Sequence, residues 1–185
     1  PFMKPIQLLT FFITTATSLV AESVWKPDNT PKSIPPGMFQ LDPSLEVTAW
    51  ATTPQLYNPT NMDIDHEGRI WVTEGVNYRG NKGQRPAGDR VVILQDTNGD
   101  GKCDHSHTFV QEPGFIAPLG IAVFDNIIYV SQPPDLLAYT DVNRDLKFDP
   151  EVDKREVILT GFNAINHDHG LHSLVAGPGG KFYFN

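Results

Sequence analysis

The sequence predicts an all-β fold made of repeated antiparallel sheets, and three observations support this fold class. The 185 residues include 15 Gly and 16 Pro, which favours many turns over long helices. A pair of short strands recurs three times, each time with an aromatic residue in the second strand: Trp71, Tyr129 and Tyr183. Two further strands and an acidic loop follow the first two copies. Repeated four-stranded units are typical of propeller blades, so we expect an incomplete β-propeller with about two and a half blades.

The first 57 residues are expected to precede the propeller. Residues 1–23 are predicted to be a signal peptide, because Lys4 precedes an apolar segment, Ile6 to Val20, that is too short to span a bilayer. A buried amino-terminal strand is the alternative. Residues 24–57 form a proline-rich lead-in that ends in a first outer strand, predicted from the alternation of Leu45, Val47 and Ala49. We therefore expect an exported protein, located in the periplasm or cell envelope.

The blades are predicted at residues 58–112, 117–162 and 170–185, with the last one truncated. The first two aromatic residues, Trp71 and Tyr129, are 58 positions apart, whereas the acidic loops begin at Asp96 and Asp141, 45 positions apart. An insertion between the second and third strands of the first blade accounts for the difference. This insert, Glu74 to Asp89, is rich in Gly, Asn and Arg and is predicted to be a surface loop. We also expect the chain to be part of a longer protein.

Loop positions follow from the order of the strands. Adjacent antiparallel strands are joined by hairpins, so successive connections alternate between the two ends of a sheet. The loop between the second and third strands therefore shares a face with the loop that leads to the next blade. This places Glu74 to Asp89 and Asn163 to His172 on one face, and the acidic loops on the opposite face.

The two acidic loops have the spacing of a calcium-binding loop. Each places oxygen-bearing side chains at positions one, three, five and nine, as such loops require. The first loop has Gly101 at position six for a sharp turn, whereas the second has Leu146 there. The alternative is an Asx-rich turn held by its own hydrogen bonds. The predicted metal ligands are Asp96, Asn98, Asp100 and Asp104 in the first loop and Asp141, Asn143, Asp145 and Asp149 in the second.

A cluster of His167, Asp168, His169 and His172 lies in the other group of loops. Imidazole titrates near neutral pH, and a neighbouring carboxylate can orient it, so the cluster is a candidate general base. Two alternatives remain open: a transition-metal site that needs a further ligand, and polar histidines exposed to water.

The net charge argues against two classes of binding partner, and the cysteine content excludes an internal disulfide. The formal net charge of −8 argues against nucleic acid or an anionic membrane surface as a partner, because both require basic patches. The single cysteine, Cys103, permits no internal disulfide and is expected to be an inert packing residue.

Several motifs resemble known families. The dipeptide Asp168-His169, followed eight positions later by Gly177-Pro178 and then by Lys181-Phe182-Tyr183, resembles the soluble quinoprotein glucose and sorbosone dehydrogenases. Those enzymes are six-bladed, TolB-like propellers. Motifs across Asn58 to Asn185 are more closely similar to the membrane-bound dehydrogenase family of planctomycetes and their relatives. These motifs are Asn58-Pro59-Thr60, Trp71 to Glu74 with Tyr78-Arg79, Asp96 to Asp104, and His169 to Ser173.

The resemblance implies oxidation of a sugar or polyol hydroxyl, with hydride transfer to pyrroloquinoline quinone (PQQ). It implies that His169 is the general base and that Asp168 supports it, while Arg79, His167 and His172 contact the cofactor. A further electron acceptor, such as a c-type cytochrome, is implied, and haem c is expected only in sequence beyond this chain. Two other functions remain open: a calcium-dependent, lactonase-like hydrolase, and a non-catalytic propeller that binds partners in the cell envelope.

Overall fold

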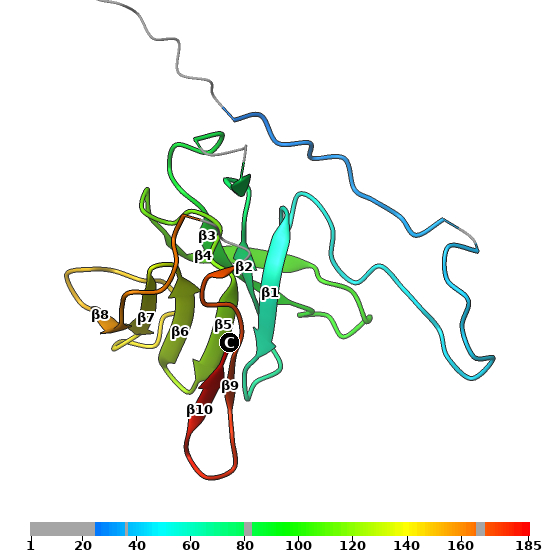
Figure 1. Ribbon diagram of the computed structural model, residues 1–185. Helices are drawn as coiled ribbons and strands as arrows, with labels where there is room; N and C mark the ends of the chain where they lie inside the picture. Colours follow the sequence, from blue (N-terminus) through cyan, green and yellow to red (C-terminus); the bar gives the residue numbers. More distant parts are fainter. Residues whose placement is uncertain (1–24, 36, 80–82, 166–168) are drawn as a thin grey trace, which may run out of the picture.

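The computed structural model describes residues 25–35, 37–79, 83–165 and 169–185, and within these residues it contains ten β-strands (Figure 1). The strands form two four-stranded sheets and one two-stranded sheet, in which all neighbouring strands are antiparallel. No helix able to cross a membrane occurs among the described residues. The predicted all-β class and the partial propeller are confirmed.

The first blade is a simple meander. It consists of β1 (Pro59–Ile64), β2 (Ile70–Glu74), β3 (Arg90–Gln95) and β4 (His105–Gln111), in the order β1-β2-β3-β4. Its inner strands are nearly continuous apolar runs because both faces of the sheet are covered. The aromatic residue of the repeat, Trp71, lies in β2 opposite Asp63 and Ile93.

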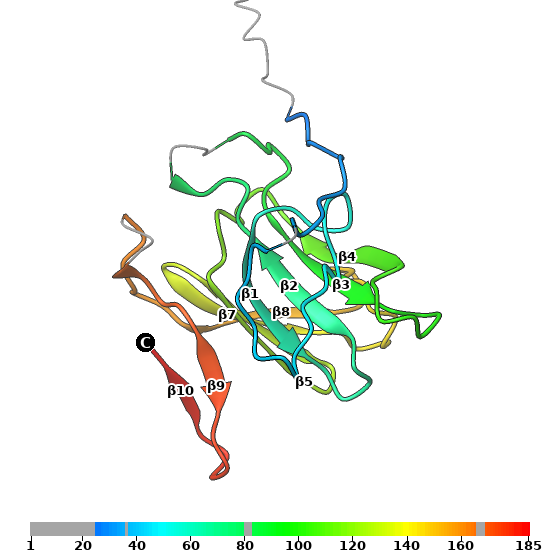
Figure 2. The ribbon, with the colours of Figure 1, turned by 90° about the vertical axis from the view of Figure 1, so that its right-hand side faces the viewer.

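The second blade repeats this order, and a hairpin begins the third. The second blade contains β5 (Gly120–Phe124), β6 (Ile127–Gln132), β7 (Asp135–Thr140) and β8 (Lys154–Leu159). Strands β9 (Leu174–Ala176) and β10 (Phe182–Phe184) pair with each other. Figure 2 shows this hairpin as a separate sheet beside the two larger ones, with its turn directed away from them.

Facing side chains of the first two blades form the main core. Trp71, Ile93 and Phe109 of the first blade pack with Val130 and Tyr139 of the second, and all five are at most 1% exposed. The rings meet edge to face: the Phe109 and Tyr139 centroids are 6.3 Å apart with an angle of 86° between the ring planes. This face-to-face packing is the relation expected between successive propeller blades.

The third sheet packs on the other side of the second blade. Phe182 of β10 contacts Phe124 and Tyr129, with ring centroids 5.2 and 4.9 Å apart. Leu171 and Leu174 are buried in the same cluster. The segment that carries the histidines is therefore fixed to the second blade by the apolar residues on either side of His172.

Two sequence predictions require correction. Residues 45–51 do not form a strand: they have no ladder partner among the described residues, and Leu45 and Val47 are 64% and 40% exposed. Trp50 O accepts one backbone hydrogen bond, from Cys103 N at 2.8 Å, and Trp50 and Ala51 pack against the first blade, but no ladder forms. The insert is not simply a surface loop either, because Glu74, Arg85 and Asp89 within it are buried. The predicted signal peptide, residues 1–23, lies outside the described residues.

A buried carboxylate closes the turn between β1 and β2. Asp65 accepts hydrogen bonds from Trp71 Nε1 at 2.8 Å, from Arg69 Nε at 2.6 Å and from the Arg69 backbone N–H at 3.0 Å. Burial raises the pKa of Asp65, but the bonds from Trp71 and Arg69 outweigh this effect and hold the pKa below its usual value. Ionised Asp65 therefore stabilises the fold.

We expect this contribution to decrease in acid. It is fully present above the unfolded-state pKa of about 3.9 and is lost as pH falls through the lower folded-state pKa. Calorimetry of the full-length protein between pH about 5 and 2 should show a smaller loss of unfolding temperature for Asp65→Asn than for the wild type. The control is Glu151→Gln, at an exposed carboxylate. Equal acid dependence in Asp65→Asn and the wild type would contradict the assignment.

Candidate functional site at the mouth face

Four loops lie on one face of the blades, which we call the mouth face. Their described residues are 75–79 with 83–89, 112–119, 133–134, and 160–165 with 169–173. Asp89 joins the first two, since its Oδ2 accepts a hydrogen bond from Ala117 N at 2.7 Å and its N–H donates to Phe115 O at 3.0 Å. The other two meet at Gly170, where an added Cβ would lie 2.7 Å from Pro133 Cγ. Gln132 links the two pairs, because its Oε1 accepts a hydrogen bond from Ile116 N at 3.1 Å. The described parts of the insert and of the histidine loop therefore lie on one face, as predicted.

The acidic loops lie on the opposite face, as expected. Arg144 of the second acidic loop forms two hydrogen bonds, of 2.7 and 2.6 Å, with Asp125 in the β5–β6 turn. Asp141 N–H donates to Asn126 O in the same turn at 2.9 Å. These turns are at the end of the sheets remote from the mouth face.

His172 is the best-defined histidine of the predicted cluster. Its carbonyl accepts a hydrogen bond from Ser131 Oγ at 2.7 Å, and its N–H donates to Asn185 O at 2.9 Å. The ring is partly buried, and its Nε2 is buried without a hydrogen-bond partner among the described residues. A buried polar atom without a partner is costly in a folded protein, and this one identifies a position that a ligand can satisfy.

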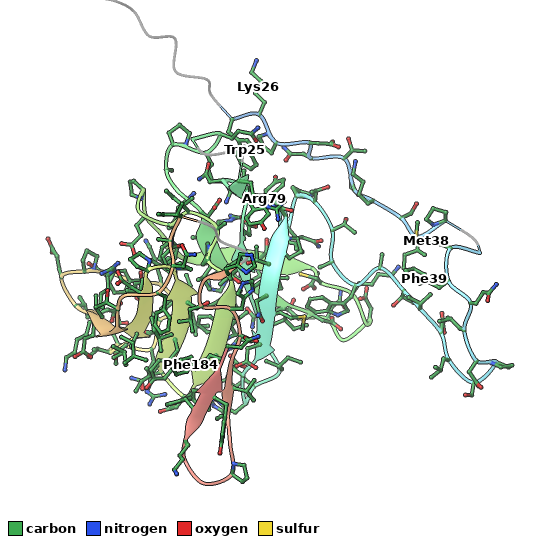
Figure 3. All side chains as sticks on the ribbon, viewed as in Figure 1. Trp25, Lys26, Met38, Phe39, Arg79 and Phe184 are labelled. Carbon is green, nitrogen blue, oxygen red and sulfur yellow. The ribbon has the colours of Figure 1, made fainter. Side chains whose placement is uncertain are left out.

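The other predicted site residues are less constrained. His169 is exposed on the same loop, whereas His167 and Asp168 lie outside the described residues. Arg79 is exposed in the insert, adopts a φ of 53° and places its guanidinium 5.0 Å from the centroid of the Tyr78 ring. Figure 3 shows Arg79 at the same end of the first blade as Trp25 and Lys26. The topology thus brings Arg79, His169 and His172 to one face.

A buried ion network supports the insert, and sequence reasoning missed it. Glu74 is fully buried and accepts hydrogen bonds from Arg85 at 2.7 Å and from Arg90 at 2.8 and 3.0 Å. The Tyr57 backbone N–H donates to the same carboxylate at 2.8 Å. One carboxylate therefore connects the lead-in, the insert and β3. The signal available in the sequence was a glutamate directly following a buried strand, with two arginines downstream.

A second buried carboxylate continues this network. Asp89 accepts bonds from the backbone N–H groups of Ala117 and Asn77, and Arg85 Nη1 lies 3.9 Å from its Oδ1. Burial raises the pKa of Asp89, and these hydrogen bonds and the Arg85 charge offset this only in part. Asn77 holds the insert closed, because its side chain both donates to Arg85 O and accepts from Arg85 N–H, at 3.0 and 2.9 Å.

The acidic loops share one hydrogen-bond pattern. Asp96 accepts bonds from the Gly99 and Gly101 N–H groups, at 2.7 and 2.8 Å, and Asp141 likewise accepts from Leu146 N–H at 2.9 Å. Leu146 adopts a φ of 64°, close to the 81° of Gly101, and its side chain packs against the core. The second loop therefore makes the same sharp turn without glycine, at some backbone strain.

The carboxylates of these loops cap their own backbone, as the Asx-turn alternative describes. The described residues contain no group of three or more His, Cys, Asp or Glu side chains arranged to hold a metal ion. Calcium binding therefore remains a prediction from the spacing of the residues. Cys103 packs with Val72, Val92 and Leu94, and burial raises the pKa of its thiol.

Comparisons with known proteins give one family and two similar structures. A family model described as Domain of unknown function (DUF7133) matches residues 35–185. No curated protein matches the sequence. The calcium structure of a Trichoderma reesei carbohydrate-active enzyme of family AA12 is 21% identical, with a TM-score of 0.46. The iodide structure of a family AA12 enzyme from the same organism is 19% identical, with a TM-score of 0.42. Each match covers 65% of this chain and 27% of the other chain.

Proposed function

We propose that this chain, which belongs to the DUF7133 family, is part of an exported quinoprotein-type dehydrogenase that oxidises a sugar or polyol hydroxyl. The observation that carries the proposal is the position of two loops on the same face of the blades. One loop has the Asp168-His169 motif and His172, and the other has Arg79. The same face would admit the substrate from solvent.

The side chains of the mouth face fit an anionic quinone. The guanidinium of Arg79 supplies positive charge for a carboxylate, and the buried Nε2 of His172 needs a hydrogen-bond partner. Arg79 and His172, with His167, would contact PQQ, which when bound accepts a hydride from the substrate carbon. The later blades of the longer protein would supply the rest of the site, together with the electron acceptor.

This chain's own contribution to the chemistry is proton removal. His169 is exposed on the mouth face, so its imidazole is accessible to a substrate hydroxyl. Neutral imidazole accepts the hydroxyl proton, and the carboxylate of Asp168 would orient the ring and stabilise the imidazolium that forms. The described ion network beneath the insert keeps Arg79 at the mouth while this occurs.

The test measures dye-linked oxidation of sugars and polyols by the full-length protein supplied with PQQ. We expect His169→Ala to lower kcat at least about a hundredfold, the smallest effect typical of losing a general base. The matched control is His66→Ala, at an exposed histidine of the β1–β2 turn on the opposite face, which should retain full activity. Equal rates for the two variants would exclude His169 as the base. Lactone hydrolysis that needs no quinone would instead support the hydrolase alternative.

A further inference from the structure

A pocket lies beside the mouth face, between the lead-in and the insert. We call it the lead-in pocket; its volume is about 300 Å³, within the range of small-molecule sites. Trp25 and Asp28 come from the start of the lead-in, Thr53 and Tyr57 from its end, and Gln84 from the insert. Segments distant in the sequence therefore build one concave surface.

The aromatic side of the pocket is held rigidly. The Trp25 and Tyr57 rings meet edge to face, with centroids 5.0 Å apart and 87° between their planes. The guanidinium of buried Arg85 lies 4.2 Å from the Trp25 centroid and 5.7 Å from that of Tyr57. Tyr57 is fixed further by its N–H bond to Glu74 and by a hydroxyl bond to Asn29 Oδ1. The two rings are thus positioned before any ligand arrives.

The polar side of the pocket offers hydrogen bonds with little net charge. Asn58 donates through Nδ2 to Gly75 O, and no hydrogen bond to its Oδ1 is found among the described residues. Thr53 Oγ1 donates to Thr30 O at 2.7 Å and can still accept a bond. The carboxylate of Asp28 is paired with Lys32 at 2.6 Å. Asp28 is thus neutralised by Lys32, Lys26 adds one ammonium donor to the lining, and hydroxyl groups would find acceptors in Asn58 and Thr53.

We propose that the lead-in pocket binds a single neutral saccharide ring. One face of a pyranose ring is lined by C–H groups, which pack well on the electron-rich face or the edge of an aromatic side chain. Its hydroxyl groups would meet the Asn58 and Thr53 oxygens. The pocket size, the paired aromatic rings and the hydrogen-bonding groups of Asn58 and Thr53 favour a saccharide ring, and the Lys26 ammonium can donate to its oxygens. The binding does not require the proposed oxidation, because His169 and His172 do not line this pocket.

The test is saturation-transfer NMR and calorimetry on the full-length protein without quinone. The probes are methyl β-D-glucopyranoside and methyl α-D-mannopyranoside, with sorbitol as an open-chain polyol that has hydroxyls but no ring face. We expect a glycoside Kd on the order of 1 mM, about tenfold weaker in Trp25→Ala and nearly unchanged in Trp25→Phe, which retains an aromatic ring. Sorbitol should bind much more weakly than either glycoside.

The variants separate this site from the proposed catalytic one. His169→Ala should abolish oxidation yet leave glycoside binding without quinone unchanged. If His169→Ala or His172→Ala weakens binding and Trp25→Ala does not, the sugar is bound at the histidines and the proposal is wrong. Absence of glycoside binding, or equal binding of sorbitol, would also overturn it. Trp25→Phe is the control for a folding defect, because it preserves the aromatic contact with Arg85.

Discussion

Replacing Glu74 with alanine should destabilise the protein by about 3–5 kcal/mol, the cost typical of breaking a buried ion pair by removing one partner. Glu74 is completely buried and is the only carboxylate within hydrogen-bond distance of Arg85 and Arg90 among the described residues. Its removal leaves Arg90 without its anion and Arg85 with only the more distant Asp89, at 3.9 Å, and it also removes the acceptor of the Tyr57 N–H bond. Because whole domains are stable by only about 5–15 kcal/mol, much of the first blade's stability depends on this side chain.

Differential scanning calorimetry of the full-length protein measures this effect. The matched control is Glu67→Ala, which also removes a glutamate paired with arginine, at 2.9 Å from Arg69. The Glu67 side chain is 57% exposed, however, so the expected cost is only about 0–1 kcal/mol. Glu74→Gln, which keeps the shape but removes the charge, should lie between the two. Similar unfolding temperatures for Glu74→Ala and Glu67→Ala would show that the network does not stabilise the blade.

The sequence was sufficient to predict the blades because their inner strands, such as β2, β3, β5 and β7, are buried on both faces. Such strands are short apolar runs, and the recurring aromatic residues, Trp71 and Tyr129, mark equivalent positions in two sheets. The face assignment needed only the count of hairpins between one loop and the next. Neither inference depends on which particular side chains touch.

The features that were missed depend on such contacts. Glu74 pairs with arginines 11 and 16 positions later, and only the folded insert brings these side chains together. The alternation in residues 45–51 satisfied a strand pattern, but a strand also requires a ladder of backbone hydrogen bonds, and the segment makes only the bond from Cys103 N to Trp50 O. The spacing in the acidic loops identified the turn correctly. The alternative of an Asx-rich turn also anticipated that these carboxylates bind their own backbone.

Gly120→Ala should displace the histidine loop from the second blade. Gly120 begins β5, and a Cβ placed there would lie 1.9 Å from His172 O and 2.7 Å from Ser131 Oγ. A backbone carbonyl cannot yield as a flexible side chain does, so His172 must move and its bond from Ser131 must break. Overpacking of this kind typically costs about 1–3 kcal/mol. Displacement of the loop would also move His169, and dehydrogenase activity should fall about a hundredfold or more.

Gly114→Ala is the matched control for this prediction. Gly114 lies on the linker just before β5, but a Cβ there would meet nothing within 4 Å, and its backbone is not in the left-handed region. Hydrogen exchange supplies a readout that does not depend on catalysis, because the His172 N–H is protected by its bond to Asn185 O. We expect faster exchange at His172 in Gly120→Ala and unchanged exchange in Gly114→Ala.

If the two variants have the same exchange rate at His172 and the same activity, close packing of His172 against β5 does not position the mouth-face histidines. If only exchange increases, the loop is held by Gly120 but His169 is not the base, so the packing and the proposed chemistry can be tested separately.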